Sequence, residues 1–125
     1  MNGQPKVEIP FGFWSRDPSD TTLPFPVANA GGEFSVQAVE RLKALEKSGK
    51  TRELGYRGWS ACRICRKSNG SRTFFYTDSS ESLGVDMEYS WPSGFMHYLE
   101  EHNIRAPGVL FDLLKIFESK EAISG

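Results

Sequence analysis

The sequence has few cysteines and histidines and no long apolar run. Two cysteines and two histidines occur among 125 residues, and cysteines separated by only two residues cannot form the disulfide framework of a small secreted protein. No segment approaches the ~18–20 apolar residues of a membrane-spanning helix. The N-terminal region also lacks the basic and apolar parts of a signal peptide. We therefore expect a cytoplasmic protein with no membrane partner.

The sequence also lacks an excess of charge of either sign. Its 15 Lys and Arg residues are offset by 16 Asp and Glu residues, for a net charge of -1, which excludes a globally basic, histone-like protein. The length is typical of one domain, since domains run roughly 100–150 residues. A chain of this size can bury about two-thirds of its unfolded surface, so we expect a single domain with its own apolar core.

Proline and glycine are concentrated near the N-terminus. Five of the seven prolines precede Val27, and the pair Gly31-Gly32 follows them. Proline removes backbone donors and glycine raises the entropic cost of ordering, so this stretch resists regular structure. Its interspersed aromatic residues are not typical of a disordered linker. We expect residues 1–33 to form an irregular arm packed on a domain of residues 34–125. Exchange of the arm onto a partner subunit is the alternative.

The clearest predicted helix covers residues 35–48. Ser35 is the expected N-cap, and Gly49 is the expected left-handed residue after the C-terminus. Apolar side chains recur at helical spacing and are expected to face the core: Val36, Val39, Leu42 and Leu45.

Two further helices are expected in the C-terminal half. One should open near residues 91–93, with Pro92 in its first turn, and close near Asn103. The other covers residues 107–120, where apolar side chains occupy more than one helical face. That pattern predicts burial in the core. A homodimer or protein-partner interface through this helix is the alternative, because so much exposed apolar surface would invite association.

Short strands are expected between the helices. Residues 56–60, 73–77 and 85–89 have the β-branched, aromatic or alternating pattern of strands. Asn69-Gly70 is the strongest two-residue turn signal in the chain, and the polar residues 78–84 are expected to form a loop.

The cysteines and histidines form two pairs with ligand-like spacing. Cys62 and Cys65 form Cys-x2-Cys, and His97 and His102 form His-x4-His further along the chain. Structural zinc sites use four thiolate and imidazole ligands in a tetrahedron. No other cysteine or histidine occurs in the sequence. The pattern therefore predicts a Zn²⁺ site formed by these four residues.

The histidine spacing places a condition on the helix that carries it. Residues five positions apart lie about 140° apart around a helix axis, so His97 and His102 converge only if the helix tightens or unwinds near His102. Asn103 is well suited to leave the helix there. The gap between the two pairs exceeds the roughly 12–15 residues of a short finger and has room for a hairpin and a third strand. We expect a zinc module over about residues 55–105.

These elements predict an α+β fold class. We expect a small antiparallel sheet with a zinc knuckle, of ββα or treble-clef-like type, packed with about three helices. Two other interpretations of the cysteines stay open. A redox-active Cys-x-x-Cys needs a βαβ context, which the Asn69-Gly70 hairpin signal disfavours. Alternatively, the four residues are unconnected parts of the core.

Four ligands fill a structural site, whereas a catalytic zinc usually keeps one open position. The His-Glu-x-x-His, Gly-rich phosphate-loop and Gly-x-Ser-x-Gly signatures are absent, so we predict no catalytic residue. A zinc-dependent hydrolase stays an alternative if one histidine is free and Glu100, Glu101 or Asp78 lies beside the metal.

Charge is segregated along the chain although it balances. The charged residues within 50–72 are basic except for Glu53, whereas residues 78–101 contain Asp and Glu but no Lys or Arg. The basic segment fits a phosphate-contacting patch with aromatic stacking platforms. The alternative is that the two segments neutralise each other across a hairpin. The candidate residues for nucleic-acid or partner binding are Arg57, Trp59, Arg63, Arg66, Lys67, Arg72 and Trp91.

The motifs of this region also form a recognisable combination: Gly58-Trp59-Ser60, Cys62-Arg63-Ile64-Cys65, Asn69-Gly70-Ser71, Trp91-Pro92-Ser93-Gly94, His97-Tyr98, His102 and Pro107. The combination resembles a group of small bacterial and phage zinc-finger-like proteins of uncharacterised activity, over about residues 55–107. The resemblance implies the same four zinc ligands and a bacterial or phage origin. This chain departs from the pattern in the longer Ser/Glu-rich insert that follows Asp78.

The sequence thus predicts a zinc-binding domain with a structural Cys2His2 site that acts as a protein-interaction or adaptor module. A nucleic-acid-binding protein that uses the basic residues 50–72 is one alternative. A zinc-dependent hydrolase is the other.

Overall fold

The computed structural model describes residues 5–13, 26–80 and 84–124, with the side chains of residues 56–60, 69, 80 and 123–124 left aside. The fold of the described residues is α+β, as expected. Its elements in chain order are β1 (Lys6–Pro10), α1 (Gly32–Lys47), β2 (Arg52–Ala61), β3 (Ser68–Ser80), β4 (Val85–Pro92), α2 (Phe95–His102) and α3 (Gly108–Ser124).

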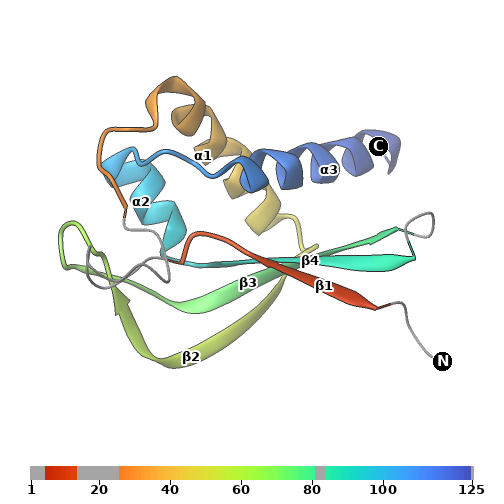
Figure 1. Cartoon of the computed structure of the whole chain (residues 1–125), viewed down its shortest axis with the longest axis horizontal. Helices are drawn as coiled ribbons and strands as arrows, with labels where there is room; N and C mark the ends of the chain where they lie inside the picture. The colour runs from red at the N-terminus through yellow and green to blue at the C-terminus, as the bar shows by residue number, and fades with distance from the viewer. Residues whose placement is uncertain (1–4, 14–25, 81–83, 125) are drawn as a thin grey trace.

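The four strands form one mixed sheet in the order β1-β4-β3-β2 (Figure 1). β2 and β4 each pair antiparallel with β3, whereas β1 pairs parallel with β4. The expectation of a purely antiparallel sheet is therefore wrong. The arm is also not irregular throughout, because Lys6–Pro10 forms an edge strand. Pro10 ends that strand, at the edge of the sheet, where a missing backbone N–H is tolerated.

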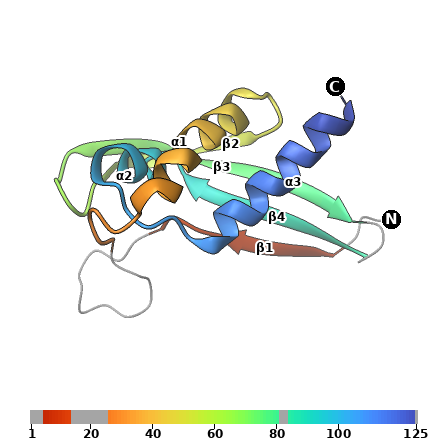
Figure 2. The same ribbon diagram turned by 90° about the horizontal axis from the view of Figure 1, so that it is seen from above.

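All three helices lie on one face of the sheet (Figures 1 and 2). α2 stands at the end of the sheet where β2 turns into β3, and α3 extends toward the opposite end (Figure 1). The core lies between the helices and this face of the sheet. Its largest fully buried side chains are Trp91, Phe95, Leu42, Leu45, Leu99, Ile104, Leu110, Leu113 and Leu114.

The first helix begins earlier than expected and buries part of the predicted apolar face. α1 follows the N-cap Gly31, which offers no side-chain cap, so Ser35 lies inside the helix and is only 1% exposed. The Ser35 hydroxyl oxygen accepts a hydrogen bond from the backbone N–H of Ala106 at 3.0 Å. Val36, expected in the core, is 58% exposed. Gly49 has a φ of 79°, which confirms the left-handed residue after the helix.

The β2–β3 hairpin reverses at residues 62–67 and not at Asn69-Gly70. The backbone N–H of Cys62 donates to the Lys67 carbonyl at 2.8 Å and closes the turn. Gly70 lies in β3 opposite Ser60, beside a shift in the strand register, with a φ of 139°. Glycine is suited to an irregular point in a strand ladder as well as to a turn. The sequence signal at Asn69-Gly70 therefore indicated a turn where the structure has an irregular strand.

Two boundaries around β4 also differ from the prediction. β3 extends to Ser80, so the expected loop before β4 begins later. β4 runs through Pro92, and α2 begins only at Phe95. Trp91 therefore belongs to a strand, and its ring stacks on Phe11 with the centroids 5.4 Å apart. This contact fixes the chain that follows β1 onto the core.

The last helix is a core element, as the sequence predicts. Its buried side chains are Leu110, Leu113, Leu114 and Phe117. Phe117 meets the ring of Tyr76 on β3 edge-to-face, with the centroids 6.2 Å apart. None of the helices in the described ranges combines the length and apolar character needed to cross a bilayer.

Candidate metal centre

The turn at residues 62–67 brings the two cysteines together. Its first carbonyl, that of Cys62, accepts from the Arg66 N–H at 2.9 Å. Arg66 has a φ of 67°, a value that is uncommon for a residue other than glycine, and leads the chain back into β3. The N–H groups of Ile64 and Cys65 point at the Cys62 sulfur, with N···S distances of 3.4 and 3.5 Å. Such donors stabilise a thiolate.

α2 supplies the two histidines from its two ends. His97 lies in the first turn, and His102 is the last helical residue. Asn103 then adopts the left-handed conformation, with φ 44° and ψ 51°, and its N–H donates to the Tyr98 carbonyl. The helix thus ends where the histidine spacing requires it to. The two imidazole rings meet edge-to-face, with their centroids 5.0 Å apart.

The side chains of Cys62, Cys65, His97 and His102 converge on one point. One donor atom from each lies within 4.8 Å of the other three, and the Cys65 Sγ is 3.4 Å from the His97 Nε2. Ligands of a tetrahedral zinc, with bonds of about 2.0–2.3 Å, lie roughly 3.3–3.8 Å apart. The group is positioned to bind a metal ion.

The surroundings of the group also fit a metal. Nε2 of His102 is buried and has no hydrogen-bond partner among the described residues. An unsatisfied buried nitrogen costs about 1–3 kcal/mol, which a coordinated metal would offset. Cys62 is fully buried, and neither it nor Cys65 takes part in a disulfide. Two thiols and two imidazoles are the donor set that zinc prefers.

The protonation of His97 suits a metal ligand. Burial, and next the neighbouring His102, lower the pKa of His97, and Lys67 acts in the same direction. The carboxylates of Glu101 and Glu100 oppose this shift without reversing it. Imidazole binds a metal in its neutral form, so at neutral pH this ring is in the binding form.

Tyr98 connects α2 to the cysteine turn. Its side chain is buried, and its hydroxyl oxygen accepts from the Arg63 N–H at 2.7 Å. Burial is the main cause that raises the pKa of Tyr98, and a hydrogen bond with the Cys62 side chain adds to it. Tyr98 was not among the residues predicted for the metal site. Its position four residues before His102, and so on the same helix face, was the available signal.

The segment before α1 is attached to the same end of α2. The N–H of Asn29 donates to the His102 carbonyl at 2.7 Å, and the N–H of Gly31 donates to the Asn103 carbonyl at 2.8 Å. Two backbone hydrogen bonds thus join the start of α1 to the last histidine. No local sequence motif predicts these contacts, because they connect residues that are far apart in the chain.

The predicted binding residues are distributed over different environments. Arg63, Arg66 and Lys67 lie in the turn that carries the cysteines. Arg72 forms an ion pair with Glu53 at 3.5 Å. The side chains of two further predicted residues, Arg57 and Trp59, lie outside the described part of the chain.

Trp91 differs from its expected role as a binding residue. It is fully buried, and its Nε1–H donates to the Glu46 carboxylate at 2.9 Å. The ring therefore offers no surface on which a base or a partner side chain can stack. Its place in β4 makes it a core residue.

The ion pair between Arg52 and Glu88 joins the basic segment to the acidic segment. Glu88, a buried residue of β4, pairs with Lys6 and Arg52, each at 3.3 Å. Two of the three carboxylates considered for a catalytic role form ion pairs. Glu100 pairs with Lys43 at 2.9 Å, and Asp78 pairs with Lys120 at 2.5 Å.

Comparisons of the chain with protein-family models, curated proteins and solved structures found no match. The properties of the centre therefore follow from the residues of this chain alone.

Proposed function

We propose that this chain is a zinc-binding domain in which Cys62, Cys65, His97 and His102 hold one Zn²⁺ in a structural site. One observation carries the proposal: four thiol and imidazole donors from two separate elements lie within 4.8 Å of one another. The two pairs are brought together by the reversal of the β2–β3 hairpin and the unwinding of α2 at Asn103. We further propose that the folded domain acts as a protein-interaction module.

The donor set favours zinc over other divalent ions. Thiolate ligands select zinc against magnesium, calcium and manganese, which prefer oxygen. In the turn at residues 62–67, two amide N–H groups face the first cysteine sulfur at 3.4 and 3.5 Å, which supports the proposal of a zinc knuckle. These donors would offset the charge of two thiolates on one ion.

A structural role agrees with the number of ligands and with the energies. Four protein ligands complete a tetrahedron and leave no open position. Zinc binding in small fingers contributes about 10–16 kcal/mol, against a net stability of about 5–15 kcal/mol for a whole domain. When bound, zinc would supply a cross-link between the hairpin and α2. The Tyr98 hydroxyl, which accepts from the Arg63 N–H, would hold the cysteine turn against α2.

The hydrolase alternative receives no support from the contacts. It needs a carboxylate beside a free coordination position. Two of the three candidate carboxylates, Glu100 and Asp78, form ion pairs with lysines. The hydrolase alternative also needs one histidine to stay free of the metal. The buried Nε2 of His102 has no other partner among the described residues, which supports its role as a ligand.

Exposed apolar side chains support the protein-interaction role. Phe34 is 74% exposed, and Val27 is 65% exposed. Exposed apolar side chains mark partner surfaces where they gather in one patch or line a groove. Phe34 does so, because it lines a cavity between α1 and the loop before α3.

Nucleic-acid binding is the second candidate, favoured by the exposed Arg66 and Lys67 on the cysteine turn. The burial of Trp91 removes one proposed stacking platform. A shift assay with single-stranded and duplex oligonucleotides decides between the candidates. The protein-interaction role predicts no shift even at ~50 mM salt, where phosphate contacts are strong. A shift that weakens steeply with salt would favour nucleic acid.

Metal analysis tests the zinc proposal. Protein purified without chelator is expected to contain one zinc per chain, and Co²⁺ is expected to replace it with the absorption of a tetrahedral thiolate site. Cys62→Ser and His102→Ala are expected to lose the metal. Glu101→Gln changes an exposed side chain next to His102 and serves as the matched control. Absence of metal from the unmodified protein, or full retention in Cys62→Ser, would refute the proposal.

A further inference from the structure

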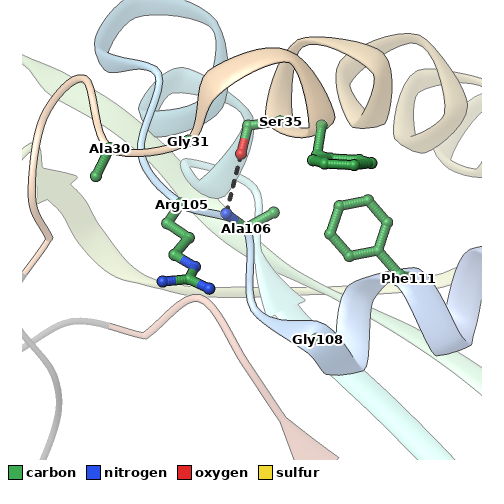
Figure 3. A pocket seen from close by; sticks show the side chains of 8 residues that line it. Ala30, Gly31, Ser35, Arg105, Ala106, Gly108 and Phe111 are labelled. Atoms are coloured by element: carbon green, nitrogen blue, oxygen red, sulfur yellow. Dashed lines mark hydrogen bonds between the residues drawn. The ribbon is translucent and has the colours of Figure 1, made fainter.

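A cavity of about 450 Å³ lies away from the cysteine turn, where the start of α1 meets the loop that leads into α3. Phe34 and Ser35 line it from α1, Phe111 from α3, and Arg105 and Ala106 from the loop. Figure 3 shows Arg105 and Phe111 on opposite sides of Ala106. The cavity therefore has a cationic side and an aromatic side.

The aromatic side of the cavity is incompletely covered by this chain. Phe34 is 74% exposed, although most large apolar side chains of the described residues are buried. Phe111 packs only partly against the core. An apolar group seated between these two rings would remove aromatic surface from water, at about 25 cal/mol per Å².

The cationic side is Arg105. Its side chain is exposed, and no carboxylate of the described residues forms an ion pair with it. This contrasts with Arg41, Arg52 and Arg72, which are all paired. Glu33 lies in the first turn of α1 but does not line the cavity. A carboxylate from a ligand would complement the guanidinium.

The cavity walls are held in place by the fold. The Ala106 N–H donates to the buried Ser35 hydroxyl at 3.0 Å, as the dashed line in Figure 3 marks. Gly31 has no room for a side chain, because a Cβ there would collide with the Ile104 carbonyl and the Ser35 hydroxyl. A ligand would therefore meet a preformed site, which reduces the ordering cost of binding.

We propose that this cavity binds a segment of a protein partner in which an Asp or Glu stands next to a large apolar side chain. The apolar side chain packs between Phe34 and Phe111, and the carboxylate pairs with Arg105. The inference rests on the proposed protein-interaction role of the domain and names the chemistry of its partner. It does not depend on which metal occupies the cysteine–histidine centre.

A charge-reversal selection tests the proposal. A phage-displayed library of linear peptides is panned against the full metal-loaded chain and against Arg105→Glu. The unmodified chain is expected to enrich peptides with an acidic residue beside an aromatic or aliphatic one. Arg105→Glu is expected to enrich Lys or Arg at that position instead. Lys115→Glu places the same charge on an exposed position of α3 outside the cavity and is the matched control.

The affinity of the most enriched peptide tests the two sides separately. Fluorescence anisotropy is expected to show binding about tenfold weaker for Arg105→Glu and for Phe34→Ser. Because Phe34 is highly exposed, its replacement leaves the core intact. Val36→Ser removes a similarly exposed side chain of α1 that does not line the cavity and is expected to bind normally.

Three results would overturn the proposal. One is the absence of any enriched sequence class, and another is the same class selected by the unmodified chain and by Arg105→Glu. The third is displacement of the peptide by free phenylacetate at equal concentration, which would make the cavity a small-molecule site. Zinc content measured on the same samples separates this inference from the proposed metal site. Failed selection with zinc bound contradicts only the peptide proposal, and absent zinc with normal selection contradicts only the metal proposal.

Discussion

The helices α2 and α3 lie on the same face of the sheet, but different contacts hold them there (Figure 1). α3 has 17 residues and buries four apolar side chains, whereas α2 has 8 residues and buries Phe95, Tyr98 and Leu99. At the α2 end four thiol and imidazole donors converge. At the α3 end the contacts are apolar, supplemented by the ion pairs of Lys120 with Asp78 and of Glu118 with Arg41.

A bound metal would add more to the stability of the short helix α2 than to that of the long helix α3. A helix of two turns is marginal on its own, because helix formation begins with a costly nucleus. α3 overcomes that cost through its length and its leucines, while α2 has fewer side chains to bury. We infer that zinc supplies at the α2 end the stability that apolar packing supplies at the α3 end.

The start of α1 forms hydrogen bonds with both the α2 end and the α3 end. Asn29 and Gly31 donate to the backbone at the end of α2, and Ser35 accepts from Ala106 just before α3. A change at the metal centre therefore has a short backbone path to the cavity that contains Arg105.

Loss of a cysteine ligand is expected to have the largest effect. Cys62→Ser should lower the free energy of unfolding by on the order of 5 kcal/mol or more, because it removes the metal that contributes about 10–16 kcal/mol in small fingers. Urea unfolding followed by circular dichroism measures the change. A variant that has verifiably lost its metal and yet unfolds at the same urea concentration would contradict the prediction.

Truncation of a buried side chain at the α3 end should lower the free energy of unfolding by a smaller amount and leave the metal in place. Leu113 is fully buried in α3, so Leu113→Ala is expected to destabilise the domain by about 2–5 kcal/mol. The same urea experiment measures it, together with zinc content. Loss of zinc from this variant while the rest of the chain stays folded would mean that the two ends are not held separately.

Removal of one hydroxyl at the metal end should have a smaller effect. Tyr98→Phe leaves the Arg63 N–H without its acceptor, which we expect to cost about 1 kcal/mol. The stoichiometry of zinc should stay the same, whereas zinc should pass to a competing chelator faster than from the unmodified protein. Equal stability and equal transfer rates would show that this hydrogen bond does not support the cysteine turn.

The smallest effect is expected between the two ends, at Glu46. Burial is the main cause that raises the pKa of Glu46, and the Trp91 hydrogen bond opposes it. A carboxyl with a raised folded-state pKa contributes stability that is fully present below its unfolded pKa and lost as pH rises through the folded pKa. Glu46→Gln, which keeps an oxygen acceptor for Trp91, should therefore be more stable than the unmodified protein at neutral pH. The gain should disappear in acid.

Thermal unfolding across pH measures this difference. Glu40→Gln, on an exposed position of the same helix, is the matched control and is expected to change little. A Glu46→Gln variant whose advantage grows in acid would have the wrong sign for a desolvated carboxylate.

The site was easier to predict from the sequence than the sheet around it. The convergence of the two cysteines and two histidines was predicted because these residue types are rare here and their spacing reflects local geometry. The structure brings their donor atoms within 4.8 Å of one another. The unwinding at Asn103 followed from the angle between helical positions and is confirmed by its φ of 44°. Both inferences depend on short stretches of chain.

The misplaced elements depend on distant contacts. Lys6–Pro10 was taken as irregular because of its prolines, and only its parallel pairing with β4 makes it a strand. Ser35 resembled a cap, but its hydroxyl bonds to Ala106 across the core. Likewise, the cavity beside Arg105 is lined by residues of two helices, α1 and α3, that are far apart in the sequence. No local pattern encodes such contacts.

Hydrogen exchange of the full chain with and without a chelator tests the central claim most directly. After verified metal removal, the amides of α2 and of residues 62–67 should lose protection, while those of α3 should stay protected longer. Unchanged protection of α2 in the metal-free protein would contradict the claim that zinc replaces apolar packing at that end. Equal loss of protection in α2 and α3 would contradict it as well.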